Sequence, residues 1–194
     1  MGSEPSINPS ERATFRSFQE STREDWALIM SQIGATQDLV ADNALYLLRR
    51  LAGDHGGFPV SRLEHSLQTA TRAERDGRDS EYVVCALLHD IGDTLAPFNH
   101  PYIASTMLKP FASEANHFMV AHHGIFQGYY FWHHIGLDRN ARDAHVDSPY
   151  YDYTEEFCAK YDSPAFDCDY RSAPLEHFEP LVRSFFADRT RARG

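Results

Sequence analysis

The residues with the clearest capacity for chemistry stand at the end of an apolar run. Residues 83–88 (VVCALL) are apolar throughout, and His89 and Asp90 follow directly. A helix that is apolar on every side is predicted to be buried, so His89 and Asp90 should emerge at its C-terminal end inside the protein. A buried charge must be paired or bound to metal, and imidazole and carboxylate are ligands for iron, zinc and manganese. The pair is therefore a candidate metal site, while a capping or core pair explains these two residues equally well.

Length and charge narrow the classes of function. With 194 residues the chain can bury a sizeable core, and we expect one domain over 11–188 with flexible ends at 1–10 and 189–194. The net charge of −10 and only two lysines argue against a nucleic-acid partner. No apolar run is long enough to span a membrane, no signal-peptide core is present, and the three cysteines form no Cys-x-x-Cys motif. These features predict a cytoplasmic protein with reduced cysteines and no membrane partner.

Hydrophobic periodicity predicts helices and no sheet. A capping-box spacing at Ser21–Glu24 should begin a first helix that stops at Gly34, and the last helix should lie near Leu175–Ala187. Residues 138–152 read as an exposed acidic connection. The predicted fold class is all-α. The other expected helices cover about 36–51, 61 onward, 80–88, 102–110 and 113–123.

Polar positions on the third expected helix fall on one stripe. His65, Gln68, Thr69 and Arg72 are spaced i, i+3, i+4 and i+7, so they share a face that either meets solvent or forms the wall of a site. The loop before this helix, residues 53–59, is rich in glycine and is predicted to be flexible; a lid is one interpretation of it, which the sequence leaves open.

The densest aromatic segment is Phe126–His134 (FQGYYFWHH). Such a segment is more often core or packing surface, and the functional alternative is a wall of the substrate pocket. The isolated histidines are more often surface or hydrogen-bonded core residues than ligands; they are His55, His117, His133, His134, His145 and His177.

The order of histidines and aspartates resembles that of the HD-domain metalloproteins. The order H…HD…H…H…D is formed by His65, His89-Asp90, His100, His122-His123 and a late aspartate, within a resemblance that spans about Phe15 to Phe186. Two motifs are narrower: Leu63–Ala70 (LEHSLQTA) and Phe157–Asp162 (FCAKYD) resemble the HD-domain mixed-valent diiron oxygenases, which include myo-inositol oxygenase and the phosphonate-cleaving oxygenases. Phe15-Arg16 and the aromatic stretch from His123 to Trp132 are also similar to myo-inositol oxygenase.

This resemblance implies an HD-domain helical bundle with a dinuclear metal site in its core. It assigns the first iron to His65, His89 and Asp162. It assigns the second iron to His100 and His123, with Asp90 bridging the two. His123 fits the family spacing better than His122 because the matching position follows Met119 by four. His122 would then lie behind the ligands or face the substrate, and with Asp90 and Asp93 it is a candidate catalytic residue.

The function implied is an O2-dependent diiron oxygenase that oxidises or cleaves a small polar organic substrate. Its cofactors would be two iron ions in the Fe(II)/Fe(III) state, with O2 as co-substrate. The chain departs from the inositol enzyme at Asp93 and Phe166, where that enzyme has lysines, and from the phosphonate enzymes at Gln127 and Ala159, where those have basic residues. An acidic Asp93 near aromatic rings suits a hydroxylated or cationic substrate. The candidate substrate contacts are Gln68, Asp93, Gln127, Tyr129, Trp132 and Phe166.

Two alternatives share the same histidines and aspartates. An HD phosphohydrolase would use Mn or another divalent metal, and Arg62, Arg72 and Arg75 are available for its phosphate clamp. A metal-binding or regulatory module without activity is the other alternative. All three interpretations predict a small-molecule or metal partner, and none specifies the oligomeric state.

Overall fold

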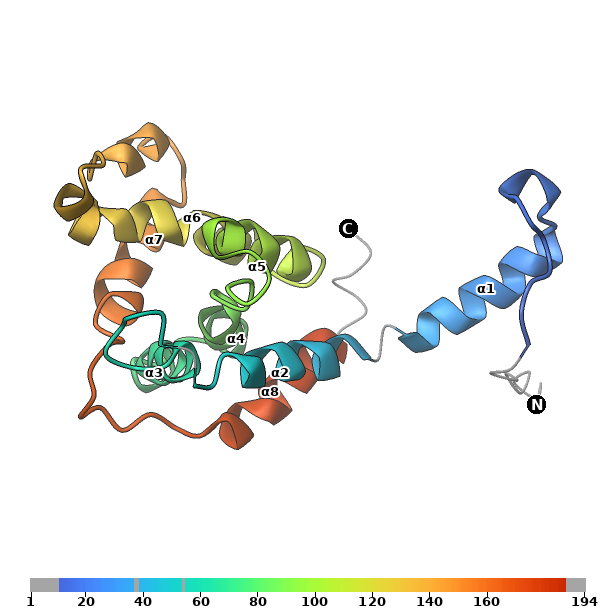
Figure 1. Ribbon diagram of the computed structural model, residues 1–194, viewed down its shortest axis with the longest axis horizontal. Coiled ribbons are helices and arrows are strands. Elements are labelled where there is room, and N and C mark those ends of the chain that lie inside the picture. The colour runs from blue at the N-terminus through green and yellow to red at the C-terminus, as the bar shows by residue number, and fades with distance from the viewer. Residues whose placement is uncertain (1–10, 37–38, 54, 188–194) are drawn as a thin grey trace.

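The computed structural model describes residues 11–36, 39–53 and 55–187, and this part of the chain is helical without any strand (Figure 1). The all-α prediction is therefore confirmed for it, whereas the expected flexible ends, 1–10 and 189–194, lie outside the described residues. The α-helices are α1 (Arg23–Thr36), α2 (Val40–Arg50), α3 (Arg62–Arg75), α4 (Ser80–Leu88), α5 (His100–Leu108), α6 (Glu114–Phe131), α7 (Tyr151–Phe157) and α8 (Leu175–Ala187). Short 3-10 turns are η1 (Phe18–Glu20), η3 (Pro97–Asn99), η4 (Trp132–Ile135) and η5 (Ala141–His145), and η6 (Cys158–Asp162) is a π-helical turn.

Helix α4 is the centre of the bundle. Every residue from Tyr82 to Leu88 is buried, as the apolar run predicts. Figure 1 shows α4 among α3, α5 and α8, and α4 packs against α3, α6 and α8. Leu45 and Leu48 of α2 and Phe178 and Val182 of α8 add further buried side chains to the same core. The C-terminal end of α4 is therefore held in the interior by packing on several sides.

A tight connection joins α3 to α4 and sets their relative position. The Ser61 hydroxyl caps α3 by accepting a hydrogen bond from the Glu64 backbone N–H (3.1 Å). At the other end Gly77, with φ +80°, closes the helix while the Arg78 N–H donates to the Ala73 carbonyl (3.1 Å). Asp79 then caps α4. Because the connection is so short, the helices run antiparallel, and the start of α3 lies beside the end of α4.

A second hairpin, α5 with α6, packs against the end of α4. Ser113 caps α6 at its N-terminus, and α5 begins at His100. A Cβ atom on Gly92 would lie 2.7 Å from the backbone oxygen of His100, so only glycine permits this close approach. The close contact places the start of α5 next to the turn that follows α4.

Several predicted boundaries are wrong. Helix α1 continues past Gly34 to Thr36, and its capping pair is Thr22 with Asp25 rather than Ser21 with Glu24, since Thr22 and Asp25 exchange side-chain to backbone hydrogen bonds. Helix α2 starts only at Val40. Helix α6 runs to Phe131 instead of ending near 123, because its aromatic half packs against η5 and α7. The connection expected over 138–152 contains η5 and the start of α7.

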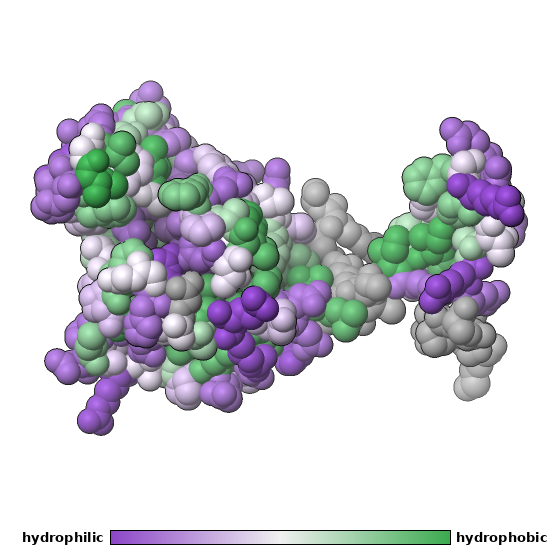
Figure 2. All heavy atoms as spheres, in the orientation of Figure 1, coloured by the Kyte–Doolittle hydropathy of each residue, from purple (hydrophilic) through white to green (hydrophobic). Residues whose placement is uncertain are grey.

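Helix α1 stands apart from the bundle in Figure 1. Its Trp26, Met30 and Ile33 side chains are exposed, and Figure 2 shows apolar side chains on its surface. Among the helices of the described ranges, none has the length and apolar character needed to cross a lipid bilayer.

Candidate metal centre

Three residues from distant parts of the chain form what we call the inner set: His65 of α3, His89 at the end of α4 and Asp162 of η6. The His65 Nε2 atom lies 3.1 Å from Asp162 Oδ1 and 3.2 Å from His89 Nε2. All three side chains are buried. These ligand atoms lie close enough together to bind one ion.

Two further histidines form the outer set: His100, the first residue of α5, and His123, in the middle of α6. Their Nε2 atoms are 3.1 Å apart. The His123 side chain is 1% exposed, whereas the His100 side chain is 20% exposed. The outer set is thus the side of the cluster that meets solvent.

Asp90 lies between the two sets and turns one carboxylate oxygen to each. Its Oδ2 atom is 3.4 Å from His65 Nε2 and 3.5 Å from His89 Nε2. Its Oδ1 atom is 3.1 Å from the Nε2 atoms of both His100 and His123. This is the arrangement required of a carboxylate shared by two neighbouring metal ions.

The four imidazole rings are all oriented in the same manner, with Nε2 toward the centre and Nδ1 at a backbone carbonyl. Because a carbonyl only accepts, each Nδ1 carries the hydrogen and each Nε2 lone pair is free to bind metal. The four contacts are His65 to Ala165 (3.2 Å), His89 to Ala86 (2.7 Å), His100 to Pro97 (2.6 Å) and His123 to Val120 (2.8 Å).

The electrostatics of the cluster favour a cation. Burial would raise the pKa of Asp162, but the His65 and His89 side chains that face its carboxylate lower this pKa below the ordinary value. The pKa of Asp90 follows the same pattern. Burial raises it, but the surrounding histidines lower it by more than burial raises it, so the pKa lies well below the ordinary value. Burial lowers the pKa of His123, which favours the neutral, metal-binding imidazole. Asp162 Oδ2 is buried without a hydrogen-bond partner, so ionised carboxylates are held here with ligand capacity to spare.

A π-helical turn delivers Asp162 to the cluster. Such turns are rare and occur mostly at functional sites, because one extra residue in the turn redirects the side chains around it. Gln127, predicted as a substrate contact, donates a hydrogen bond from Nε2 to Asp162 Oδ1 (2.7 Å). Its position on α6, four residues after His123, brings it to the same face as that histidine.

Arg62, named from the sequence only as one of three arginines available for a phosphate clamp, lies beside the cluster. It forms an ion pair with Asp93, and its Nη2 atom lies 3.4 Å from Asp90 Oδ2. Asp93 also lies beside His100, with 3.2 Å between Oδ1 and Nδ1. The signal was available, since Arg62 precedes His65 by three residues on one helix. Asp93 is therefore already balanced by a cation of the protein, which removes the free negative charge that the cationic-substrate hypothesis needs.

Two stacked phenylalanines cover the inner set. The Phe166 ring stacks on His65 with centroids 4.3 Å apart, and the Phe58 ring stacks on Phe166 at 5.1 Å. Phe58 belongs to the glycine-rich loop over 53–59, of which Asp54 lies outside the described residues. Gln68 is buried and holds the segment after Phe166, because its side-chain amide bonds to the backbone of Asp167 (2.7 Å). His65 and Gln68 of the polar stripe on α3 are therefore buried at the site, whereas Arg72 of the same stripe lines a separate cavity.

The remaining predicted residues are not brought into the cluster. His122 bonds through Nδ1 to the Phe118 carbonyl (2.8 Å), so of the two adjacent histidines it is His123 that joins Asp90. The Tyr129 ring is covered by the guanidinium groups of Arg139 and Arg142, at 4.1 and 3.8 Å. Trp132 packs directly against Gly128, where a Cβ would lie 2.4 Å from the indole ring.

Comparison with known proteins identifies the region that holds most of these residues. Residues 62–156 match the HD domain family. This region is an HD domain. Over 50 residues the chain is also 48% identical to a 1-hydroxy-2-(trimethylamino)ethylphosphonate dioxygenase (glycine-betaine-forming) of Leisingera caerulea, and the match covers 26% of each chain. The chain thus spans about a quarter of that relative's length in the match.

The HD domain contains five of the six predicted ligands, and Asp162 follows its matched range by six residues. The family match agrees with the resemblance to HD-domain proteins, and the short match is to a dioxygenase. Together the two comparisons support a metal enzyme of the HD family.

Proposed function

We propose that this protein is an O2-dependent oxygenase with two iron ions, which oxidises or oxidatively cleaves a small polar organic molecule. The observation that carries the proposal is the position of Asp90, whose two carboxylate oxygens each face a separate set of histidines. The short match to a phosphonate dioxygenase supports an oxygenase.

The residues fit the proposed metals. Four neutral imidazoles and two carboxylates form a donor set suited to iron. The inner ion would be held by His65, His89 and Asp162. The outer ion would be held by His100 and His123, and Asp90 would be shared between the two. When bound, the iron pair supplies the capacity to bind substrate and to reduce O2.

The protein's own side chains shape the site around that chemistry. The stacked Phe58 and Phe166 rings exclude water from the face of His65, while His100 is the ligand candidate that remains open to solvent. Asp93 borders the open side, because its Oδ1 atom lies 3.2 Å from His100 Nδ1, and Arg62 forms an ion pair with Asp93 there. We therefore expect the substrate to approach past His100. There it would meet the ion pair of Arg62 and Asp93, whose two charges balance each other.

The hydrolase alternative requires a basic clamp for phosphate at the metal cluster. Arg62 is near enough, but it is ion-paired with Asp93. Arg72 and Arg75 line a separate cavity whose wall includes none of the candidate ligands. The oxygenase is therefore the function that the surroundings of the cluster favour.

Iron spectroscopy on protein loaded with iron under anaerobic conditions tests the proposal. Partial oxidation is expected to produce the paramagnetic signal of a coupled Fe(II)/Fe(III) pair, and candidate substrates are expected to shift that signal and to start O2 consumption. Release of phosphate from phosphoesters with Mn, without any need for O2, would contradict the proposal.

A further inference from the structure

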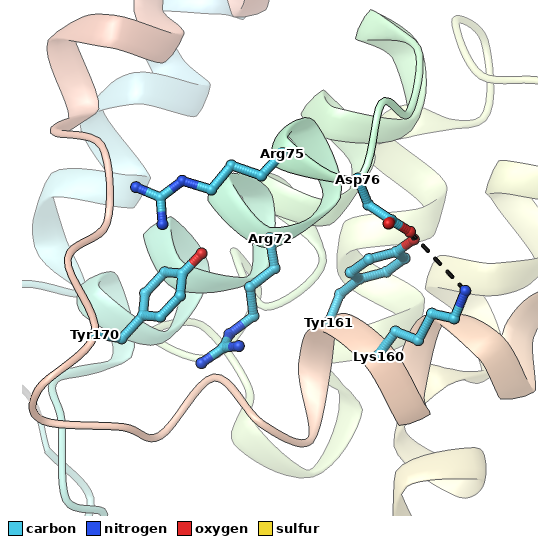
Figure 3. Close-up of a pocket in the computed structure, with 6 residues that line it drawn as sticks. All are labelled: Arg72, Arg75, Asp76, Lys160, Tyr161 and Tyr170. Atoms are coloured by element: carbon cyan, nitrogen blue, oxygen red, sulfur yellow. Dashed lines mark hydrogen bonds and ion pairs between the residues drawn. The ribbon is translucent and has the colours of Figure 1, made fainter.

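A polar cavity lies between the end of α3 and the segment that includes η6 and Tyr170 (Figure 3). Its volume is about 390 Å³. It shares none of its residues with the candidate metal centre, so it is a separate site. The lining residues are Arg72, Arg75, Asp76, Lys160, Tyr161 and Tyr170.

Two arginines of this cavity are held by an aromatic ring rather than by carboxylates. The guanidinium carbon of Arg72 lies 3.9 Å from the centre of the Tyr170 ring, and that of Arg75 lies 5.1 Å from it. Arg75 also donates to the Arg171 carbonyl (2.9 Å), and Arg72 Nε is buried without a hydrogen-bond partner. Within the described ranges neither guanidinium forms an ion pair with a carboxylate. Figure 3 shows both side chains directed toward Tyr170.

The carboxylate in the cavity wall, Asp76, contacts other side chains of the wall and not the two arginines. Asp76 accepts a hydrogen bond from the Tyr161 hydroxyl and lies 3.9 Å from Lys160 Nζ. Lys160 is closer to Glu156, at 2.7 Å. The lysine charge is therefore balanced by carboxylates, and the two arginines carry the uncompensated positive charge. The chain has a net charge of −10, so acidic partners for arginine are abundant. Two neighbouring arginines without a carboxylate partner therefore indicate a binding site for an external anion.

We propose that this cavity binds a small oxyanion of the phosphate type through Arg72 and Arg75. Guanidinium groups present planar pairs of N–H donors that match the oxygens of phosphate, and Arg is favoured where such recognition is needed. Stacking on Tyr170 holds the two groups in position before the ligand arrives, which lowers the entropy lost on binding. Free phosphate and a phosphorylated small molecule share this chemistry, and the cavity has room for either.

The cavity shares its supporting elements with the metal centre but not its ligands. Arg72 follows His65 by seven residues on α3, a separation of roughly 10 Å along the helix. Tyr161 directly precedes Asp162 in η6. An anion bound here would therefore lie behind the inner set and would not coordinate the metals.

Titration of the iron-loaded full chain with inorganic phosphate, followed by calorimetry, tests the proposal. We expect saturable binding that is at least about tenfold weaker in Arg72→Gln/Arg75→Gln, since one tenfold step corresponds to a single charge-assisted hydrogen bond. The control Arg49→Gln/Arg183→Gln removes the same charge from exposed ion pairs and should bind as the wild type does. Equal binding by the Arg72/Arg75 variant would overturn the proposal.

Two further measurements separate binding at the arginines from other effects. Because phosphate also binds metal ions, the titration is repeated on iron-free protein. We expect phosphate binding to persist there, and loss of binding together with the iron would overturn the proposal. Tyr170→Leu keeps both arginines and removes the ring, and is expected to weaken binding severalfold even if the double variant folds poorly; unchanged affinity would count against the ring-held pair.

A third titration, with glycerol phosphate, separates the two sources of the anion. Tighter binding of this monoester than of inorganic phosphate would identify a phosphorylated small molecule as the ligand class. Equal affinities would identify free phosphate. Absence of saturable binding for both compounds would refute the site, and it would leave the oxygenase proposal untouched because the two sites share no residue.

Discussion

The inner and outer sets of the metal centre differ in how the chain builds them. The inner set joins α3, α4 and η6 and is completely buried beneath Phe166, whereas the outer set comes from the α5–α6 hairpin and leaves His100 partly exposed. Both sets use the same ring orientation, and Asp90 contacts both. The difference indicates that the inner set belongs to the structural core of the bundle, while the outer set is where molecules from solvent reach the cluster.

The largest expected effect follows from removing the residue that the two sets share. Asp90→Asn takes away the negative charge that faces both, so we expect less than one iron per chain and a loss of O2 consumption beyond the roughly 10–100-fold typical of residues that only support ligands. Metal analysis and oxygen uptake measure this. Asp152→Asn, an exposed aspartate of α7, is the control and should retain both irons. An Asp90→Asn protein with two irons would show that the sets are independent.

Replacing one histidine in each set should separate their structural roles. His65→Ala opens a space beneath Phe166 and removes a buried hydrogen bond, so its iron-free form should lose about 2–4 kcal/mol of unfolding free energy. His100→Ala should cost well under half of that, because its side chain is partly exposed. Denaturant unfolding of the two iron-free proteins measures both losses of unfolding free energy. Equal losses would remove the distinction between a core set and an open set.

The adjacent histidines of α6 offer a matched pair for the outer set. His123→Ala should lose the outer iron and keep the inner one, since its Nε2 faces Asp90 Oδ1. His122→Ala should retain both, because that ring stacks on Phe118 (4.0 Å) and its Nδ1 is bonded to the same residue's carbonyl. Iron per chain is the readout. Loss of iron in His122→Ala, with both irons retained in His123→Ala, would show that His122 is the ligand and that the assignment to His123 is wrong.

A substitution at Gln127 tests how much the hydrogen bond to Asp162 contributes to the iron affinity of the inner set. Gln127→Leu removes the hydrogen bond to Asp162 Oδ1 without removing a ligand, so iron affinity should fall by about 10–100-fold. Competition with a chelator measures the change. Gln32→Leu, on α1 away from the bundle, provides the control and should not alter the affinity.

What the sequence predicted well depends on local patterns. The buried helix ending at His89 and Asp90 is a run of apolar residues, the start of α3 is set by the Ser61 cap, and the last helix was predicted with its observed bounds because its periodicity is strong. The ligand order gave the candidate set through a family resemblance, and the structure brings those six residues together.

The failures arise where distant segments decide the outcome. The ion pair of Arg62 with Asp93 joins residues 31 positions apart, and no local pattern predicts it. Residues 138–152 were predicted as an exposed acidic connection, yet α7 begins within them and continues into the π-helical turn, because Phe157 and Tyr161 pack against Tyr82. Tyr129 looked available for a substrate until the structure placed Arg139 and Arg142 on its ring.

The smallest expected effect concerns the cover over the inner set. Phe58 is 43% exposed and stacks on Phe166, while the Arg62 guanidinium lies 5.0 Å from its ring centre. Phe58→Ala should change the unfolding free energy by less than about 1 kcal/mol, because a half-exposed ring contributes little to the core.

The same change should nevertheless speed the removal of iron by a chelator severalfold, since the ring shields the inner set from solvent. Phe98→Ala removes a fully exposed ring two residues before His100 and serves as the matched control on the outer side, where no such shielding exists. Faster iron loss in Phe58→Ala alone would show that the inner set is closed by the loop that carries Phe58. Equal rates in both variants and the wild type would mean that iron leaves past His100, and the two sets would then differ in packing but not in access.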